Sequence, residues 1–213
     1  GLEVMIRVEA CPKSEQVRKA TETQFLYSPL AHQLGLYKMK SEMEDIAFRF
    51  TDPENYRLVA NKLKAGEQER KRLTDLFVKP VEMALKRAHI RYRLKSRTKT
   101  AFSIWKKMQK QQISFEQVAD LFAIRIIIDS SPETEKEVCW NVYSIVTEYY
   151  QPDTKRLRDW ITVPKENGYE SLHTTVSGPQ GSTIEVQIRS ERMDEIAESG
   201  HASHWSYKGI KGG

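Results

Sequence analysis

An eight-residue run from Leu121 to Ile128 constrains the fold more than any other part of this 213-residue chain. Apart from Arg125, every residue in the run is apolar. A short continuous apolar run is typical of a strand that is covered on both faces rather than one. We therefore expect a central strand here, within a sheet that has helices packed against it.

Other segments predict further strands. Ile90–Leu94 alternates apolar and basic residues, which predicts a half-exposed strand, and Asp159–Val163 predicts a short one. Leu172–Ser177 and Thr183–Arg189 flank the turn sequence Gly178–Gly181 and predict a hairpin. The total is about five strands.

Helical patterns fill the remainder. Up to about residue 88 the sequence predicts only helices, one beginning with Ser28 as N-cap and Pro29 at the first helical position. A second runs from Pro53 to about His89, and Pro80 is expected to kink or divide it.

Further helices are expected between and after the strands, at Ala101–Lys110, after Ser131, and at Glu191–Trp205. Ser114–Gln117 matches a capping box for one short turn. Helices first and strands later define an α+β fold, a mixed sheet of about five strands flanked by helices and preceded by an all-α segment.

Composition narrows the class of protein. With 39% apolar and 30% charged residues, the chain matches a soluble globular protein, and no run of ~18 apolar residues predicts a membrane span. Cys11 and Cys139 are distant and form no CxxC pair, so we expect no disulfide framework, no zinc site and a cytoplasmic location.

The positive charge of the chain is concentrated in one tract. Between Lys86 and Lys110 there are ten basic residues and no acid, whereas the whole chain has 34 Lys and Arg against 29 Asp and Glu. The remainder therefore has 24 basic residues against 29 acids. A solvated face normally mixes both signs, so the tract indicates a polyphosphate site, or alternatively a nucleic-acid surface.

Two carboxylates are candidate metal ligands. Asp120 precedes the apolar run, and Glu185 lies on the same face of its strand as Gln187 and Arg189, a face that His173 of the hairpin partner is expected to share. Mg²⁺ usually takes one or two protein carboxylates. For Asp120 the structural alternatives are a hydrogen-bonding residue at the start of the strand or a salt bridge to Arg125. For Glu185 the alternative is an exposed carboxylate paired with a Lys or Arg.

A polar loop from Lys165 to Tyr169 is a candidate binding loop. Tyr169 could be structural or a stacking platform for a base, and Asn167 offers both a donor and an acceptor.

Three ordered motifs together resemble the synthetase domain of RelA/SpoT-type stringent-response enzymes. They are Asp120–Arg125, Asn167–Thr175 and Ile184–Arg189, and Ala202–Trp205 with Tyr207-Lys208 resembles the end of that domain. Tyr27–Phe50 resembles the segment that joins a hydrolase domain to the synthetase. The resemblance implies a hydrolase tail and connecting helix at 1–50, a helical lead-in at 51–89, the catalytic domain at 90–208 and a tail at 209–213.

This resemblance implies a nucleotidyltransferase-like fold and an alarmone synthetase that transfers pyrophosphate from ATP to the 3′-hydroxyl of GDP or GTP. It implies that Asp120 and Glu185 are catalytic, that Asp120 holds Mg²⁺, or Mn²⁺ instead, and that Glu185 is either a second metal ligand or the base for the 3′-hydroxyl. The implied ATP-binding residues are Arg97, Lys99, Ser103 and Lys107. The implied GDP- or GTP-binding residues are Arg158, Lys165, Asn167, Tyr169, His173 and Gln187.

Two departures from the family pattern concern substrate binding. The ATP-side basic loop, expected at Ser96–Thr100, has Ser and Thr where the family often has Gly and Pro. The acceptor motif Arg156–Asp159 has Arg158 where Lys is usual, which leaves the preference between GDP and GTP open.

The resemblance also implies partners in a longer protein: an N-terminal hydrolase domain, C-terminal regulatory domains and the ribosome. Hydrolase activity is not expected in this chain, because no His is followed by Asp. The alternative function is a catalytically silent nucleotide-sensing or RNA-binding module on the same fold.

Overall fold

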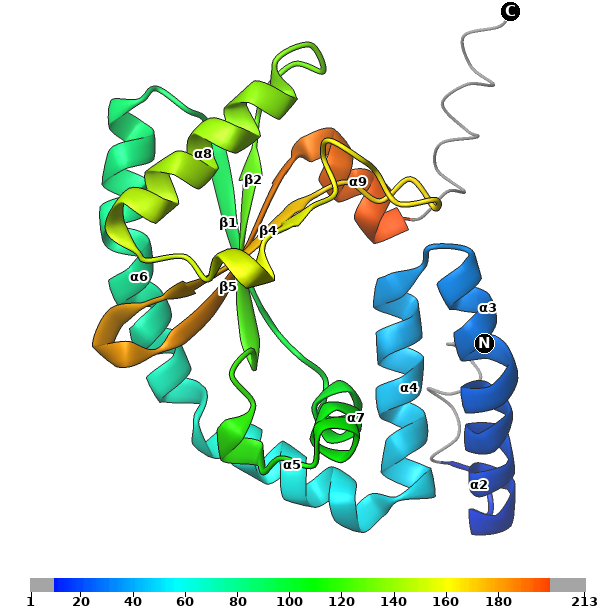
Figure 1. Ribbon diagram of the computed structural model, residues 1–213. Helices are drawn as coiled ribbons and strands as arrows, with labels where there is room; N and C mark the ends of the chain where they lie inside the picture. Colours follow the sequence, from blue (N-terminus) through cyan, green and yellow to red (C-terminus); the bar gives the residue numbers. More distant parts are fainter. Residues whose placement is uncertain (1–9, 200–213) are drawn as a thin grey trace, which may run out of the picture. The chain divides into compact units, whose positions relative to one another are not determined.

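A computed structural model describes residues 10–199, and the chain divides into two compact units (Figure 1). The first, here the helical unit, consists, within the described residues, of 10–66, Lys99–Val118 and 198–199. The second, here the sheet unit, consists of Glu67–Thr98 and Ala119–Ala197.

The helical unit is built on α4, which packs against the helices before it and against α7. Its elements are α2 (Lys13–Glu22), the π-helix η2 (Thr23–Tyr27), α3 (Ser28–Gln33), α4 (Tyr37–Thr51), α5 (Pro53–Ala65), α7 (Ala101–Gln111) and the 3₁₀ turn η3 (Phe115–Gln117). Phe48 of α4 contacts the rings of Phe102 and Trp105 on α7. Asp45 accepts a 2.8 Å hydrogen bond from the Phe102 amide, which fixes the first turn of α7.

The prediction that Ser28 caps a new helix was wrong. Helix α2 continues through η2 into α3 without a break, and the buried Ser28 hydroxyl donates to Glu44 of α4 at 2.9 Å instead of capping. Tertiary contact between two helices has overridden a local capping preference. The capping box at Ser114–Gln117 is confirmed.

Of the two outcomes expected at Pro80, a kink or a division of the second helical stretch, the division was wrong. The stretch divides at Gly66, between α5 and α6 (Glu67–Arg87), and Pro80 lies inside α6. A Pro inside a helix removes one hydrogen bond. Buried Phe77 and Val81 lie on either side of Pro80, so core packing holds the helix across it.

The sheet unit contains a five-stranded mixed sheet in the order β1-β2-β5-β4-β3. The strands are β1 (Tyr92–Thr98), β2 (Phe122–Ile128), β3 (Arg158–Asp159), β4 (Leu172–Ser177) and β5 (Thr183–Ser190). Strands β2 and β5 are parallel and every other pair is antiparallel. The predicted mixed sheet and the hairpin of β4 and β5 are confirmed.

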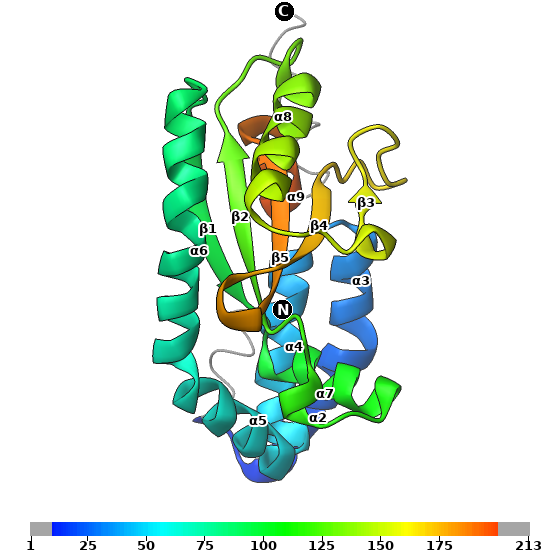
Figure 2. The same ribbon diagram turned by 60° about the vertical axis from the view of Figure 1, so that its left-hand side comes forward.

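The core lies between one face of the sheet and two helices, α6 and α8 (Glu135–Tyr149). Every residue of β2 is buried, which confirms the prediction from its apolar run. The third helix of this unit, α9 (Glu191–Ser199), follows β5 directly. Figure 2 shows α8 in front of the sheet and α9 behind it, so the two helices cover opposite faces.

Two strand boundaries differ from the predictions. Strand β1 begins at Tyr92 and continues to Thr98, through most of the predicted loop Ser96–Thr100, because Thr98 still pairs with Phe122 of β2. Backbone groups of a buried strand need partners whatever side chains the neighbouring strand carries.

Strand β3 has only two residues rather than the predicted five. The carboxylate of Asp159 accepts hydrogen bonds from the amides of Ile161 and Thr162 at 3.0 and 2.8 Å. An Asp side chain that binds amides two and three residues later turns the chain and ends the strand.

Helix α9 begins at Glu191 as predicted and is described as far as Ser199. The rest of the predicted helix, and the motifs Ala202–Trp205 and Tyr207-Lys208, lie outside the described residues. None of the helices within residues 10–199 is long and apolar enough to cross a membrane.

Candidate active site

One face of the sheet carries polar side chains in two adjacent rows. Strand register aligns one row across all five strands as Lys95, Arg125, Gln187, His173 and Arg158. The neighbouring row is Arg97, Ala123, Glu185 and Thr175. Residues two apart on a strand share a face, so both rows lie on the side away from the apolar core. We call this surface the polar face.

Glu185 and His173 meet on the polar face, as the alternation of the two strands predicted. Nδ1 of His173 lies 3.6 Å from Oε1 of Glu185. The same oxygen accepts a 2.8 Å hydrogen bond from Nε2 of Gln187. The side chain of Glu185 is only 17% exposed, so two neighbours orient a largely buried carboxylate.

Tyr169 extends this cluster. Its hydroxyl lies 2.7 Å from Nε2 of His173, and the two rings meet edge to face. The Arg189 guanidinium lies 5.9 Å from the centre of the Tyr169 ring. Burial raises the pKa of the Tyr169 phenol, so the phenol stays protonated and can donate to His173.

The loop before Tyr169 is closed by its own backbone. Gly168, at a φ of +75°, donates to the Lys165 carbonyl at 2.8 Å, and Asn167 accepts from the Tyr169 amide at 3.2 Å. The Lys165 ammonium lies 4.6 Å from the Trp160 ring and 5.1 Å from the Tyr169 ring. Burial lowers the pKa of this ammonium. Cation and ring contacts therefore hold the side chains of this loop together.

Asp120 lies in the turn that leads into β2 and is half-buried. Ala123, three residues later, pairs with Glu185 of the parallel strand β5. Parallel strands begin at the same edge of a sheet, so both carboxylates lie toward that edge. Two carboxylates are a donor set that fits Mg²⁺, which completes its shell with phosphate oxygens and water. Among residues 10–199 no group of three or more His, Cys, Asp or Glu side chains could hold a metal ion.

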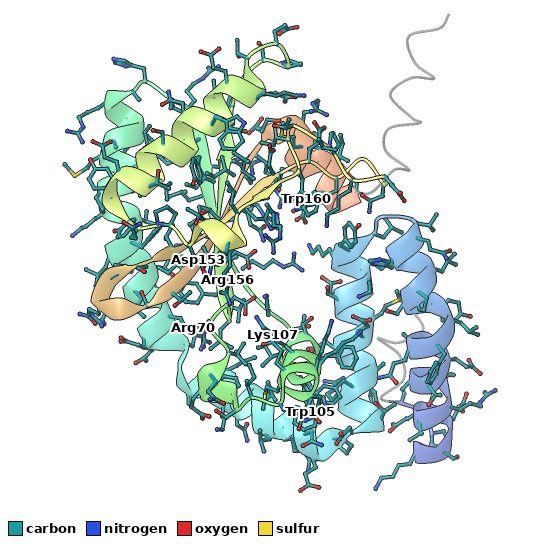
Figure 3. All side chains as sticks on the ribbon, in the orientation of Figure 1. Arg70, Trp105, Lys107, Asp153, Arg156 and Trp160 are labelled. Atoms are coloured by element: carbon teal, nitrogen blue, oxygen red, sulfur yellow. The ribbon has the colours of Figure 1, made fainter. Side chains whose placement is uncertain are left out.

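The proposed ATP-binding residues fall in both units. Arg97 is an exposed residue of β1, opposite Ala123. Lys99, Ser103 and Lys107 belong to the helical unit, and the last two lie one turn apart on α7. The Ser103 hydroxyl contacts the N-cap residue Thr100 at 2.9 Å. Lys107 and Trp105 project from different sides of α7 (Figure 3).

Arg158 ends the polar row at the sheet edge and is exposed. Its guanidinium donates to the backbone carbonyls of Lys155 and Leu157 at 3.0 and 2.9 Å. Arg156 of the same motif pairs with Asp153 at 3.7 Å (Figure 3).

A cavity of about 300 Å³ lies beside the Glu185 row. Asp153 and Arg156 line it together with Thr175, which is opposite Glu185 in the β4–β5 pairing. The other lining residues are Ala119, Val176, Ser177 and Thr183, so the cavity is mainly polar and reaches the Glu185 row through Thr175.

Sequence reasoning missed Asp194. This residue of α9 is buried and pairs with Arg125 at 3.3 Å and with Arg189 at 3.0 Å. Arg125, the one charge in a buried strand, signals that a carboxylate must lie nearby. The sequence does not say which acid of α9 supplies it, because that depends on where the helix docks.

The clusters on the polar face join into a closed ring of contacts. Arg125 donates to the side-chain oxygen of Gln187 at 3.4 Å, which links Asp194 to Glu185 through two residues. On the other side Asp194 reaches Tyr169 through Arg189. The full ring consists of Asp194, Arg125, Gln187, Glu185, His173, Tyr169 and Arg189.

Comparison with known proteins assigns the chain to a family. The sequence family described as the region found in RelA/SpoT proteins matches residues 96–211, more than half of the chain. This chain belongs to the RelA/SpoT family. Within that family it is 39% identical, over 191 residues, to the bifunctional (p)ppGpp synthase/hydrolase SpoT of Escherichia coli K12. It is 36% identical over 201 residues to the GTP pyrophosphokinase of the same organism.

These RelA/SpoT relatives are much longer proteins. The alignments cover 90% and 94% of this chain but only 26% of each relative, so the chain spans about a quarter of their length. Among solved structures, the fold is similar to that of small alarmone synthetase 1 from Bacillus subtilis, bound to its product pppGpp. That likeness has a TM-score of 0.52 at 21% identity, and covers 68% of this chain and 82% of that one. It supports the fold of the RelA/SpoT region.

Proposed function

We propose that this chain is an alarmone synthetase domain, which transfers pyrophosphate from ATP to the 3′-hydroxyl of GDP or GTP and so supports the stringent response. The products are AMP and (p)ppGpp. The observation that carries the proposal is the chain of contacts from Glu185 to His173 on the polar face and from His173 to Tyr169 of the loop. The family relatives named GTP pyrophosphokinase support the same reaction.

The proposed reaction needs one proton acceptor and a bound polyphosphate. The 3′-oxygen of the guanine nucleotide forms a bond to the β-phosphorus of ATP, and the bond from that phosphorus to the oxygen bridging the α- and β-phosphates breaks. AMP leaves with the electron pair, and the hydroxyl proton passes to the Glu185 carboxylate. A positioned carboxylate suits this role as general base.

The acceptor nucleotide is proposed to bind along the loop and strand residues. Tyr169 stacks on the guanine, and Asn167 and Lys165 contact the nucleotide from the same loop. His173, Gln187 and Arg158 share one row of the polar face and bind the ribose and phosphates.

The donor ATP is proposed to bind Arg97, Lys99, Ser103 and Lys107. Positioning and charge neutralisation dominate catalysis of such transfers, because the triphosphate carries several negative charges. Mg²⁺ or Mn²⁺ held by Asp120 would neutralise part of that charge when bound, and a second metal ligand is the alternative role for Glu185.

In a longer protein, we propose that an N-terminal hydrolase domain and C-terminal regulatory domains control this activity, with the ribosome as a partner. We propose a cytoplasmic location, where ATP and guanine nucleotides are available.

Analogues of the acceptor test the proposed reaction. Incubation of the chain with ATP, Mg²⁺ and GDP should give AMP and ppGpp in equal amounts, resolved by anion-exchange chromatography. Replacing GDP by 2′-deoxy-GDP keeps the attacking hydroxyl and should retain transfer, whereas 3′-deoxy-GDP removes it and should give none. Equal AMP formation with 3′-deoxy-GDP would point to simple ATP hydrolysis. No turnover with any acceptor, together with salt-dependent RNA binding, would favour a silent RNA-binding module.

A further inference from the structure

Asp194 forms ion pairs with three basic side chains on the polar face. Its carboxylate lies 3.0 Å from Nζ of Lys95, 3.3 Å from Nη1 of Arg125 and 3.0 Å from Nε of Arg189. The side chains of Asp194 and Arg125 are each 6% exposed, and that of Arg189 is 1% exposed. Two arginines buried this deeply require a negative partner.

The position of Asp194 in the fold explains how it reaches three strands. It lies in the first turn of α9, the helix that follows β5 directly. Lys95, Arg125 and Arg189 come from β1, β2 and β5, which are adjacent in the sheet. One carboxylate therefore ties the helix to three neighbouring strands.

Both buried arginines continue toward the proposed acceptor site. Nε of Arg125 donates to Oε1 of Gln187, whose Nε2 donates to Glu185. The guanidinium of Arg189 faces the ring of Tyr169. Asp194 reaches Gln187 through Arg125 and Tyr169 through Arg189. It is not among the residues proposed to contact ATP or the guanine nucleotide.

We infer that Asp194 is a positioning residue, which fixes Arg125 and Arg189 so that Gln187 and Tyr169 are held ready for the guanine nucleotide. This inference rests on the proposed function. Without the Asp194 carboxylate, three cations would repel one another in a site of low dielectric constant. Arg125 and Arg189 would then be free to pair with Glu185, the carboxylate that β5 carries on the same face.

The helix provides a matched control three residues before Asp194. Glu191 also pairs with a basic residue of β1, Arg93, at 3.2 Å. Both side chains of that pair are more than half exposed, at 52% and 54%, so the pair is screened by solvent. Glu191→Gln thus removes the same kind of charge from the same helix without touching the buried arginines.

The test measures KM separately for GDP and for ATP in Asp194→Asn and Glu191→Gln. We expect Asp194→Asn to raise the KM for GDP by about 10-fold or more and to lower kcat/KM for GDP by up to ~100-fold, as displacement of positioned groups does. The KM for ATP should change less than about 2-fold. Glu191→Gln should leave both KM values unchanged.

The double variant Asp194→Asn with Arg189→Gln separates positioning from general damage. If Asp194 acts through Arg189, the double variant should lose no more GDP affinity than the Asp194→Asn single variant. Additive losses, or equal losses of ATP and GDP affinity, would overturn the inference. If Asp194→Asn does not fold, Asp194→Glu takes its place, because it keeps the charge but displaces it by one methylene group. A selective rise in the KM for GDP in Asp194→Glu supports the inference, and unchanged or equally altered KM values contradict it.

Failure of the proposed function would look different. In that case the wild-type chain itself would form no ppGpp. A wild-type chain that forms ppGpp while Asp194→Asn keeps its KM for GDP would contradict only the inference about Asp194.

Discussion

The hydroxyl oxygen of Tyr169 lies 2.7 Å from Nε2 of His173. Burial raises the pKa of the phenol, so the phenol stays protonated and can donate to Nε2. On the other side of the imidazole ring, Nδ1 lies 3.6 Å from Oε1 of Glu185. His173 thereby connects the loop aromatic to the strand carboxylate.

This relationship predicts different results for two substitutions of Tyr169. Tyr169→Phe removes the hydroxyl, and with it the contact to His173, but keeps the ring, and it should raise the KM for GDP about 5-fold, the equivalent of one hydrogen bond of about 1 kcal/mol. Tyr169→Ala also removes the ring. Stacking of a base on such a ring is worth about 1–3 kcal/mol, so this substitution should raise the KM for GDP further.

Steady-state kinetics with each nucleotide varied in turn checks this prediction. The KM for ATP should stay within about 2-fold of wild type in both variants, because Tyr169 is assigned to the acceptor. If both nucleotides lose affinity to the same extent, Tyr169 is not a selective guanine platform.

On the donor side, Lys107→Ala should raise the KM for ATP. Loss of one phosphate-binding cation corresponds to about 1–3 kcal/mol, or roughly 5-fold to 150-fold in affinity. Lys110→Ala is the matched control, because Lys110 is an exposed lysine of the same helix. Equal effects of the two substitutions would indicate a general electrostatic field rather than a site at Lys107.

Stability should depend strongly on β2. Ile126 is fully buried, so Ile126→Ala should lower the free energy of unfolding by about 2–5 kcal/mol through lost burial and the cavity left behind. Val163 is 69% exposed, and Val163→Ala should change the free energy of unfolding by less than about 0.5 kcal/mol. Urea denaturation followed by circular dichroism measures both values. A small effect at Ile126 would mean that β2 is not part of the core.

The buried thiol of Cys139 should make the free energy of unfolding depend on pH in the alkaline range. Burial raises the pKa of its thiol from 9.0 to about 12, so between these values the unfolded chain loses the thiol proton and the folded chain keeps it. The unfolded state then binds fewer protons, and stability falls as pH rises above about 9. The stabilisation that comes from the protonated thiol is present in full below pH 9. About 2 kcal/mol of it is lost by about pH 10.5.

Comparison of wild type with Cys139→Ala isolates this contribution from other groups that titrate in alkali. The variant should be less stable at pH 7 because it leaves a small cavity, yet its stability should fall less steeply between about pH 9 and 10.5. Parallel pH profiles for the two proteins would rule out a buried, protonated Cys139.

Short-range patterns in the sequence predicted the parts of the fold that depend on them. The apolar run of β2 predicted a fully buried strand, and the alternation in β4 and β5 predicted that His173 and Glu185 share a face. Both predictions use the two-residue period of a strand, which holds wherever pairing is regular.

The features that sequence did not predict depend on contacts between distant segments. Strand β1 continues through Arg97 to Thr98 because β2 supplies its partners, although Ser96–Thr98 has no apolar alternation. Ser28 binds Glu44 instead of capping a helix. Asp194 is one of several acids on α9, and only the docking of that helix selects it for Arg125 and Arg189.

The central claim is that the Glu185 carboxylate accepts the proton of the attacking 3′-hydroxyl. The most direct measurement is the rate of ppGpp and AMP formation from ATP and GDP by Glu185→Gln, with Glu148→Gln as control, an exposed carboxylate on α8. Glu185→Gln should lower kcat by about 10²-fold to 10⁴-fold with the fold unchanged, the usual contribution of a general base, and the control should match wild type. Wild-type kcat in Glu185→Gln would contradict the account.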